Sequence, residues 1–192
     1  QRWRTCLHRL QAQPGVVVLT TEKRHGMYWL SGLLDPLARD PLQLPEVAQV
    51  CADLVASTQW HTYYAMHPSF IQERAHLTLA PPASVLLRLD HDGVLSATGT
   101  APYQWIVDAQ KLARTVPGIR QFRTDQLNIV DSPEQLLARA RAVLAPPATV
   151  TLRLDDSGLV VSGSAAHAWI VEARKRALNT PGLGKFREEQ LV

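Results

Sequence analysis

The residue types best suited to chemistry in this 192-residue sequence are two cysteines, seven histidines and several aspartates. The histidines are scattered, and none pairs with another histidine, a cysteine or a carboxylate at a spacing typical of metal ligands. Four aspartates lie in predicted hairpin turns: Asp90, Asp92, Asp155 and Asp156. They are too few for calcium, their spacing is not that of a calcium-binding loop, and aspartate favours turns for its own reasons. We therefore expect no metal site and no cofactor.

Catalytic motifs are also missing from the sequence. There is no nucleophile elbow, no phosphate-binding loop and no zinc-binding helix motif. We therefore expect no catalytic residues and no enzyme activity. The net charge of +3 lacks the dense Lys/Arg stripe of a nucleic-acid-binding protein, so no nucleic-acid partner is expected.

The two cysteines, Cys6 and Cys51, have no metal-type spacing but could form a disulfide. Each lies on the apolar face of a predicted helix, one over residues 2–12 and one starting at Pro45. Both helices should pack on the same sheet face. A periplasmic location would permit the bond, and two buried free thiols are the alternative. A Cα–Cα separation above about 7 Å would rule the bond out.

These residues are positioned by a sequence that repeats itself. Matched segments are Pro81–Asp90 with Pro146–Asp155, Trp105–Ala109 with Trp169–Ala173, and Pro117-Gly118-Ile119 with Pro181-Gly182-Leu183. The numbering offset is about 65 before the hairpin turn and about 64 after it, which places a one-residue deletion between Gly158 and Gly163. An internal repeat of this kind indicates a modular scaffold.

Each repeat reads as helix, strand, strand, helix, strand. The second repeat has a helix starting at His67-Pro68, a hairpin turning at Gly93, a helix over 102–115 and a strand over about 119–128. The third begins at Ser132-Pro133, where Ser132 and Gln135 can form a capping box. In the first, Asp35-Pro36 could also start a helix. A strand–helix–strand crossover makes its two strands parallel, and the hairpin adds an antiparallel strand.

The predicted fold class is α+β, with three tandem αββαβ two-layer units. Each unit would have a three-stranded mixed sheet with two helices on one face. The predicted domains are residues 1–66, a diverged copy, residues 67–129 and residues 130–192, called below the first, second and third repeats. A unit of this size is marginally stable alone, so the repeats should contact one another or a partner.

The candidate binding residues recur between the repeats. They are the tryptophans Trp105 and Trp169, the lysines Lys111 and Lys175, and the arginines Arg123 and Arg187. The tryptophans could cover the core of each repeat or pack between repeats, or they could contact a membrane interface or a partner. The basic residues could be an ordinary solvated surface, or a basic rim for anionic phospholipid head groups.

The pattern resembles the BON family of small bacterial domains. The matching residues are the hairpin glycines Gly93 and Gly99 with Pro117-Gly118, and Gly158 and Gly163 with Pro181-Gly182. The layout also resembles the region that precedes an OmpA-like domain in proteobacterial envelope proteins. The same αββαβ order is similar to the ring-building motifs of periplasmic secretion proteins, and topology alone does not separate these families.

The resemblance implies a non-enzymatic scaffold of the cell envelope, on the periplasmic side of a Gram-negative membrane. It implies protein partners or self-association, membrane-proximal attachment, and another domain following in the full-length protein. The alternatives are a ring-building segment of a secretion apparatus and a module that binds anionic phospholipid.

Overall fold

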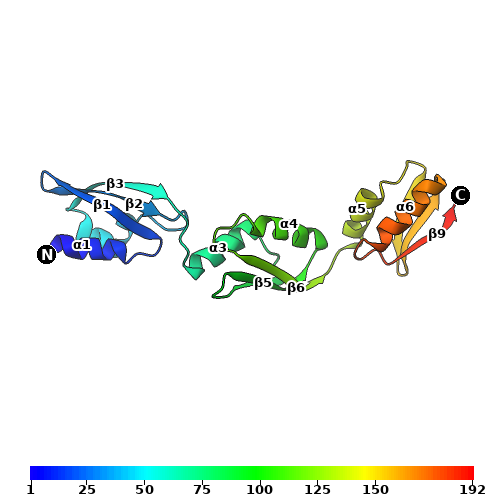
Figure 1. Cartoon of the computed structure of the whole chain (residues 1–192), viewed down its shortest axis with the longest axis horizontal. Coiled ribbons are helices and arrows are strands. Elements are labelled where there is room, and N and C mark those ends of the chain that lie inside the picture. The colour runs from blue at the N-terminus through cyan, green and yellow to red at the C-terminus, as the bar shows by residue number, and fades with distance from the viewer. The chain divides into compact units, whose positions relative to one another are not determined.

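The computed structural model describes residues 1–192 and contains three three-stranded sheets, one in each repeat (Figure 1). The first repeat holds α1 (Arg2–Gln11), β1 (Val16–Arg24), β2 (Met27–Leu34), the 3-10 helix η1 (Pro41–Gln43), α2 (Pro45–Cys51) and β3 (Val55–Thr62). The second holds α3 (Pro68–Leu79), β4 (Val85–Leu89), β5 (Val94–Ala101), α4 (Tyr103–Ala113) and β6 (Gln121–Ile129). The third holds α5 (Pro133–Leu144), β7 (Val150–Asp155), β8 (Gly158–Gly163), α6 (His167–Leu178) and β9 (Lys185–Leu191).

The strand orders are β1-β2-β3, β4-β5-β6 and β7-β8-β9, so the second strand of each hairpin is central. In the first and third sheets this strand pairs antiparallel with its hairpin partner and parallel with the strand that follows the crossover helix. Parallel neighbours need such a crossover, because a tight turn can join only antiparallel strands. The predicted fold class, tandem αββαβ units with mixed sheets, is confirmed.

Backbone contacts divide the chain into two compact units. The first comprises residues 1–80, 87–96 and 111–123, and the second comprises residues 81–86, 97–110 and 124–192. The first and third repeats therefore each lie within one compact unit, while the second repeat contributes segments to both. The domain boundaries expected from the sequence remain a prediction.

The core of the third repeat lies between two helices and one face of its sheet. Its buried residues are Ala140 and Leu144 from α5, Ala173 and Ala177 from α6, Val150, Leu152, Leu159 and Val161 from the strands, and Leu183. The start of α5 follows the sequence expectation: Ser132 Oγ accepts from Gln135 N at 3.2 Å, and Gln135 Oε1 accepts from Ser132 N at 2.8 Å. This capping box satisfies backbone N–H groups that the first turn of a helix leaves unpaired.

The first repeat departs from its sequence expectation between its second and third strands. Asp35 starts no helix; its Oδ1 accepts from Leu37 N at 2.8 Å, which closes a turn. Helix α2 begins at Pro45, as the sequence predicts, and ends at Cys51. Strand β3 runs from Val55 to Thr62, and its pairing with β2 sets its extent.

Helix α3 of the second repeat buries only some of its apolar residues. Leu77 of α3 is 62% exposed, whereas Ile71 and Ala75 on the same helix are buried. Leu77 lies six residues after Ile71, which puts it roughly 240° further round an α-helix. None of the helices is both long enough and apolar enough to span a bilayer.

Candidate functional site

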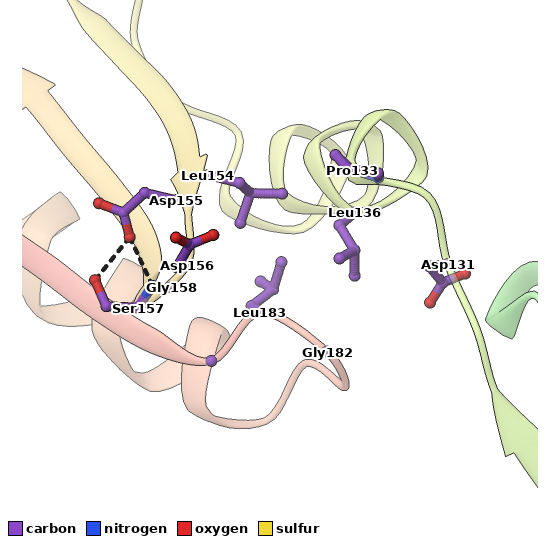
Figure 2. Close-up of a pocket in the computed structure, with 11 residues that line it drawn as sticks. Asp131, Pro133, Leu136, Leu154, Asp155, Asp156, Ser157, Gly158, Gly182 and Leu183 are labelled. Atoms are coloured by element: carbon purple, nitrogen blue, oxygen red, sulfur yellow. Dashed lines mark hydrogen bonds between the residues drawn. The ribbon is translucent and has the colours of Figure 1, made fainter.

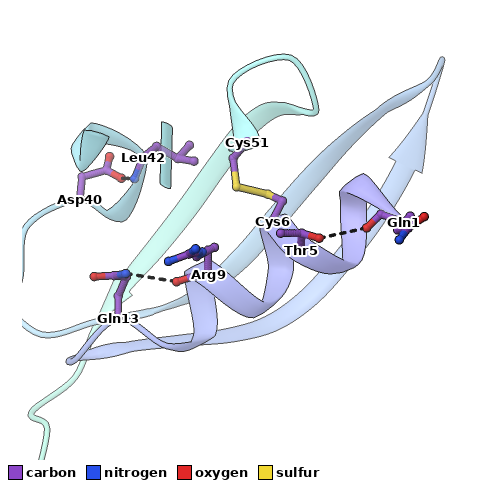
Figure 3. The surroundings of a disulfide bond; sticks show 8 residues. All are labelled: Gln1, Thr5, Cys6, Arg9, Gln13, Asp40, Leu42 and Cys51. Carbon is purple, nitrogen blue, oxygen red and sulfur yellow. Dashed lines mark hydrogen bonds between the residues drawn. A yellow bond between two sulfur atoms is a disulfide. The ribbon is translucent and has the colours of Figure 1, made fainter. Parts of the chain in front are cut away.

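The two cysteines are joined in the first repeat (Figure 3). Cys6 on α1 and Cys51 at the end of α2 have bonded Sγ atoms, with Cα atoms 5.2 Å apart. Both side chains are completely buried in the core. Cys6 precedes the core residue Leu10 by four positions, as Ala140 precedes Leu144 in the third repeat. The cysteine therefore occupies a small core position on the first helix, and the bond ties that helix to α2.

Trp169 contributes to the core of its repeat. The ring packs against the buried cluster of the third repeat, and its Nε1 donates to the carbonyl oxygen of Leu144 at 2.9 Å. This carbonyl belongs to the last turn of α5, where helical acceptors lack intrahelical donors. Trp105 occupies the equivalent position near the start of α4 and is half-buried.

The recurring basic residues lie on the second helix and on the last strand of their repeats. Lys111 and Lys175 are exposed on α4 and α6, and Arg123 is exposed on β6. Arg187 on β9 is half-buried, and its Nη1 donates to Asp155 Oδ2 at 2.9 Å and to Ser157 Oγ at 2.7 Å. In the third repeat, Arg187 is thus bound to the hairpin turn while Lys175 lies on a helix.

The turn at Asp155 borders a cavity of about 290 Å³ in the third repeat (Figure 2). Asp155 Oδ1 accepts from the backbone N and the Oγ of Ser157, at 2.9 and 2.7 Å. These bonds, led by the Ser157 hydroxyl and joined by the positive charge of Arg187, lower the pKa of Asp155. The Asp155 carboxylate therefore serves to hold the turn. The structure contains no group of three or more His, Cys, Asp or Glu side chains that could hold a metal ion.

The second and third repeats differ beside the glycine of the hairpin turn. Gly184 of the third repeat stands where the second repeat has Arg120, by the offset of about 64. In the second repeat the Arg120 side chain lies against the turn glycine: a Cβ added at Gly93 would stand 3.0 Å from Arg120 Cδ. Glycine provides no such side chain, and a Cβ added at Gly158 would instead collide with the backbone of Lys185.

A buried ion pair in the first compact unit was not found from the sequence. Arg74 Nη2 of α3 donates to Asp35 Oδ2 at 2.8 Å and to Ala65 O at 3.1 Å, and Arg74 Nη1 donates to Pro117 O at 2.7 Å. Asp35 Oδ2 also accepts from Ala65 N at 2.7 Å. The Asp35 side chain is fully buried and that of Arg74 is 10% exposed. The guanidinium lies 5.1 Å from the ring centre of Tyr64.

A second buried pair lies in the second compact unit. Arg139 Nη2 of α5 donates to Asp131 Oδ2, and Arg139 Nη1 donates to Pro181 O, both at 2.7 Å. Asp131 Oδ1 accepts from Tyr103 N at 3.0 Å, and the guanidinium lies 4.3 Å from the Tyr103 ring centre. A carboxylate, an aromatic ring and a proline carbonyl thus surround each arginine, an environment that suits a planar guanidinium better than an ammonium.

The Pro-Gly steps that recur in the sequence belong to these arrangements. Gly118 has φ +97° and Gly182 has φ +85°, and a Cβ on either would collide with a side chain of the first helix, Ile71 or Leu136. Glycine thus permits close approach, and the preceding proline carbonyl accepts from the arginine three positions further along that helix. One feature of the sequence could have indicated these two arginines: Arg74 and Arg139 are 65 positions apart, which is the offset of the repeat.

Comparison with known proteins gives little further guidance. No family model matches the chain, and no curated protein matches it. Among solved structures, the chain is similar to the C-terminal domain of CdsD, the structural protein of the type III secretion system of Chlamydia trachomatis, with 15% identity and a TM-score of 0.30 over 98% of this chain and 96% of that one. It is also similar to the periplasmic domain of PrgH, the type III secretion inner membrane protein from S. typhimurium, with 14% identity and a TM-score of 0.24 over 98% of each chain. At these TM-scores neither likeness carries an argument about this chain.

Proposed function

We propose that this chain is a non-enzymatic scaffold of the cell envelope, built from BON-like repeats, that associates with protein partners or with copies of itself. The observation that carries the proposal is the position of its exposed apolar side chains. Four of them lie on edge strands of the first two sheets: Val17 and Leu19 on β1, Leu86 on β4 and Ile129 on β6. Their exposed fractions run from 37% to 58%.

An edge strand carries backbone N–H and C=O groups that no neighbouring strand uses, so it can pair with another chain. Proteins that avoid such pairing place charges or proline on the edge. Val17 and Leu19 provide β-branched and apolar side chains instead, and they are followed by Thr20 and Thr21 before the first charge at Glu22. These features support edge-to-edge association as the physical basis of assembly.

The Cys6–Cys51 disulfide supports the proposed compartment. Disulfides persist in oxidising environments such as the bacterial periplasm and are rare in the cytosol. We therefore place the proposed scaffold on the periplasmic side of a Gram-negative membrane.

The experiment is a series of mass measurements by light scattering over a wide range of protein concentrations. We expect the wild-type mass to rise with concentration and the double variant Val17→Lys/Leu19→Lys to stay closer to monomeric, because lysine blocks edge pairing. The matched control is Leu178→Lys, which charges an exposed leucine that belongs to helix α6 and to no strand. A monomeric wild type, or equal effects of both variants, would contradict self-association through this edge.

Mass measurements and liposome flotation together separate the proposed alternatives. A ring-building segment of a secretion apparatus would reach one closed mass, whereas a spacer would remain monomeric and bind only other proteins. A phospholipid-binding module would float with anionic liposomes at low salt, and Lys111→Glu/Lys175→Glu would weaken flotation through the loss of surface attraction. Failure to float at low salt would remove the lipid-binding alternative.

A further inference from the structure

Arg74 joins residues from two consecutive repeats. Two of its acceptors, Asp35 Oδ2 and Ala65 O, belong to the first repeat, while Arg74 and its third acceptor, Pro117 O, belong to the second. All of these atoms lie within the first compact unit. Asp35 also joins the segments that follow β2 and β3, because its Oδ2 accepts from Ala65 N.

The second pair lies within the third repeat, and its carboxylate binds the second repeat through the backbone of Tyr103. Asp131 accepts from Tyr103 N, at the start of α4, and from Arg139 of α5. Beside it, Val130 N donates to Ala101 O at the end of β5. All of these atoms lie within the second compact unit.

The two pairs take their carboxylate and their aromatic ring from different positions in the fold. Asp35 follows the central strand β2 and lies 39 positions from Arg74, whereas Asp131 follows the edge strand β6 and lies 8 positions from Arg139. The aromatic rings show the opposite arrangement: Tyr64 follows the edge strand β3, and Tyr103 follows the central strand β5. The same contact is therefore built from two different local sequences.

Both carboxylates are buried, so their partners matter for stability. The side chains of Asp35 and Asp131 are 0% and 3% exposed, so each carboxylate depends on its arginine and on its backbone donors. A buried charge that loses its partner is strongly unfavourable. Unfolding of the first repeat would take Asp35 away from Arg74. Unfolding of the second repeat would take the Tyr103 N–H and ring away from the buried Asp131–Arg139 pair.

We propose that the Asp35–Arg74 and Asp131–Arg139 pairs couple the unfolding of consecutive repeats, each pair acting at one junction. Repeats of about 65 residues have little stability of their own, so such coupling would let each junction unfold as one cooperative step. This role is independent of whether the chain assembles with partners.

The test follows two amides by hydrogen exchange in the full chain. Ala65 N–H reports the first pair and Tyr103 N–H reports the second, since each donates to the carboxylate concerned. We expect Arg74→Met to accelerate exchange at Ala65 at least tenfold with little change at Tyr103, and Arg139→Met to do the reverse. In denaturant unfolding, the two repeats that meet at a junction should unfold in one transition in the wild type. In the variant at that junction they should unfold in two separate transitions.

Matched controls are Arg88→Met on β4 and Arg141→Met on α5, both at exposed arginines. Equal acceleration in the controls, or unchanged exchange at both amides in the pair variants, would overturn the proposal. If Arg74→Met leaves part of the chain unfolded, the double variant Asp35→Asn/Arg74→Met provides a second measurement. Coupling predicts that its effect on exchange is smaller than the product of the two single effects, and a purely multiplicative effect would contradict it.

Discussion

The indole Nε1 of Trp169 donates to the carbonyl oxygen of Leu144 at 2.9 Å, which links the start of α6 to the end of α5. Trp60 on β3 provides the contrast, because its Nε1 is buried and has no hydrogen-bond partner. Two tryptophans of one chain thus differ in whether the polar atom of the ring is satisfied.

Trp169→Phe should lower the free energy of unfolding by about 1–3 kcal/mol, because phenylalanine leaves the Leu144 carbonyl without its donor. Trp60→Phe removes a donor that has no acceptor, so its cost should stay within roughly 1 kcal/mol. Urea unfolding monitored by circular dichroism measures both. Equal losses in the two variants would mean that ring size alone, and not the hydrogen bond, determines the stability.

Cys6→Ala/Cys51→Ala should lower the free energy of unfolding by roughly 3–4 kcal/mol, as expected for a bond that closes a loop of this length. The residues are 45 positions apart, and alanine fits the equivalent core position in the third repeat, so the loss should come mainly from the bond. Thermal melts with and without reductant measure it. Reductant should lower the wild-type Tm and leave the double variant unchanged; an effect on both would contradict this assignment.

Ala145→Gly should raise the free energy of unfolding by about 0.5–1 kcal/mol. Ala145 ends α5 in the left-handed region, with φ +43° and ψ +60°, where glycine carries no Cβ penalty. The control is Ala138→Gly, an exposed position inside α5, which should cost about 1 kcal/mol. Changes of the same sign in both variants would show that helix propensity, and not the capping conformation, dominates at Ala145.

The pKa of Asp155 should rise toward its usual range in Ser157→Ala, because the Ser157 hydroxyl bond is the largest cause that lowers it. A carboxylate whose folded pKa lies below its unfolded pKa adds stability that is present above the unfolded pKa. That stability disappears as the pH falls through the folded pKa. In the variant this contribution should therefore be smaller, and its loss should be complete at a higher pH than in the wild type.

Titration of the carboxyl carbons by NMR measures this shift. Asp90 is the internal control, because its pKa is lowered chiefly by the backbone N–H of Val94, which Ser157→Ala leaves in place. A variant in which Asp155 titrates as in the wild type, or in which Asp90 shifts equally, would contradict the role of the hydroxyl.

The fold class followed from local patterns. Turn glycines, Pro-Gly helix stops and apolar spacing recur at a fixed offset, and each depends on residues close together in sequence. The capping box at Ser132 could be predicted for the same reason, since both partners lie within one helical turn. The extent of β3 could not be predicted in this way, because its pairing with β2 sets that extent.

The Asp35–Arg74 pair shows what local patterns leave open. Asp35-Pro36 has the residue types of a helix start, and nothing nearby in sequence indicates an arginine 39 positions away. Only the crossover that makes β2 and β3 parallel brings Ala65 to the Asp35 carboxylate, and only the packing of α3 brings in Arg74. Helices, turns and repeats arise from short-range preferences that can be read along the chain, whereas a buried ion pair depends on where distant segments meet.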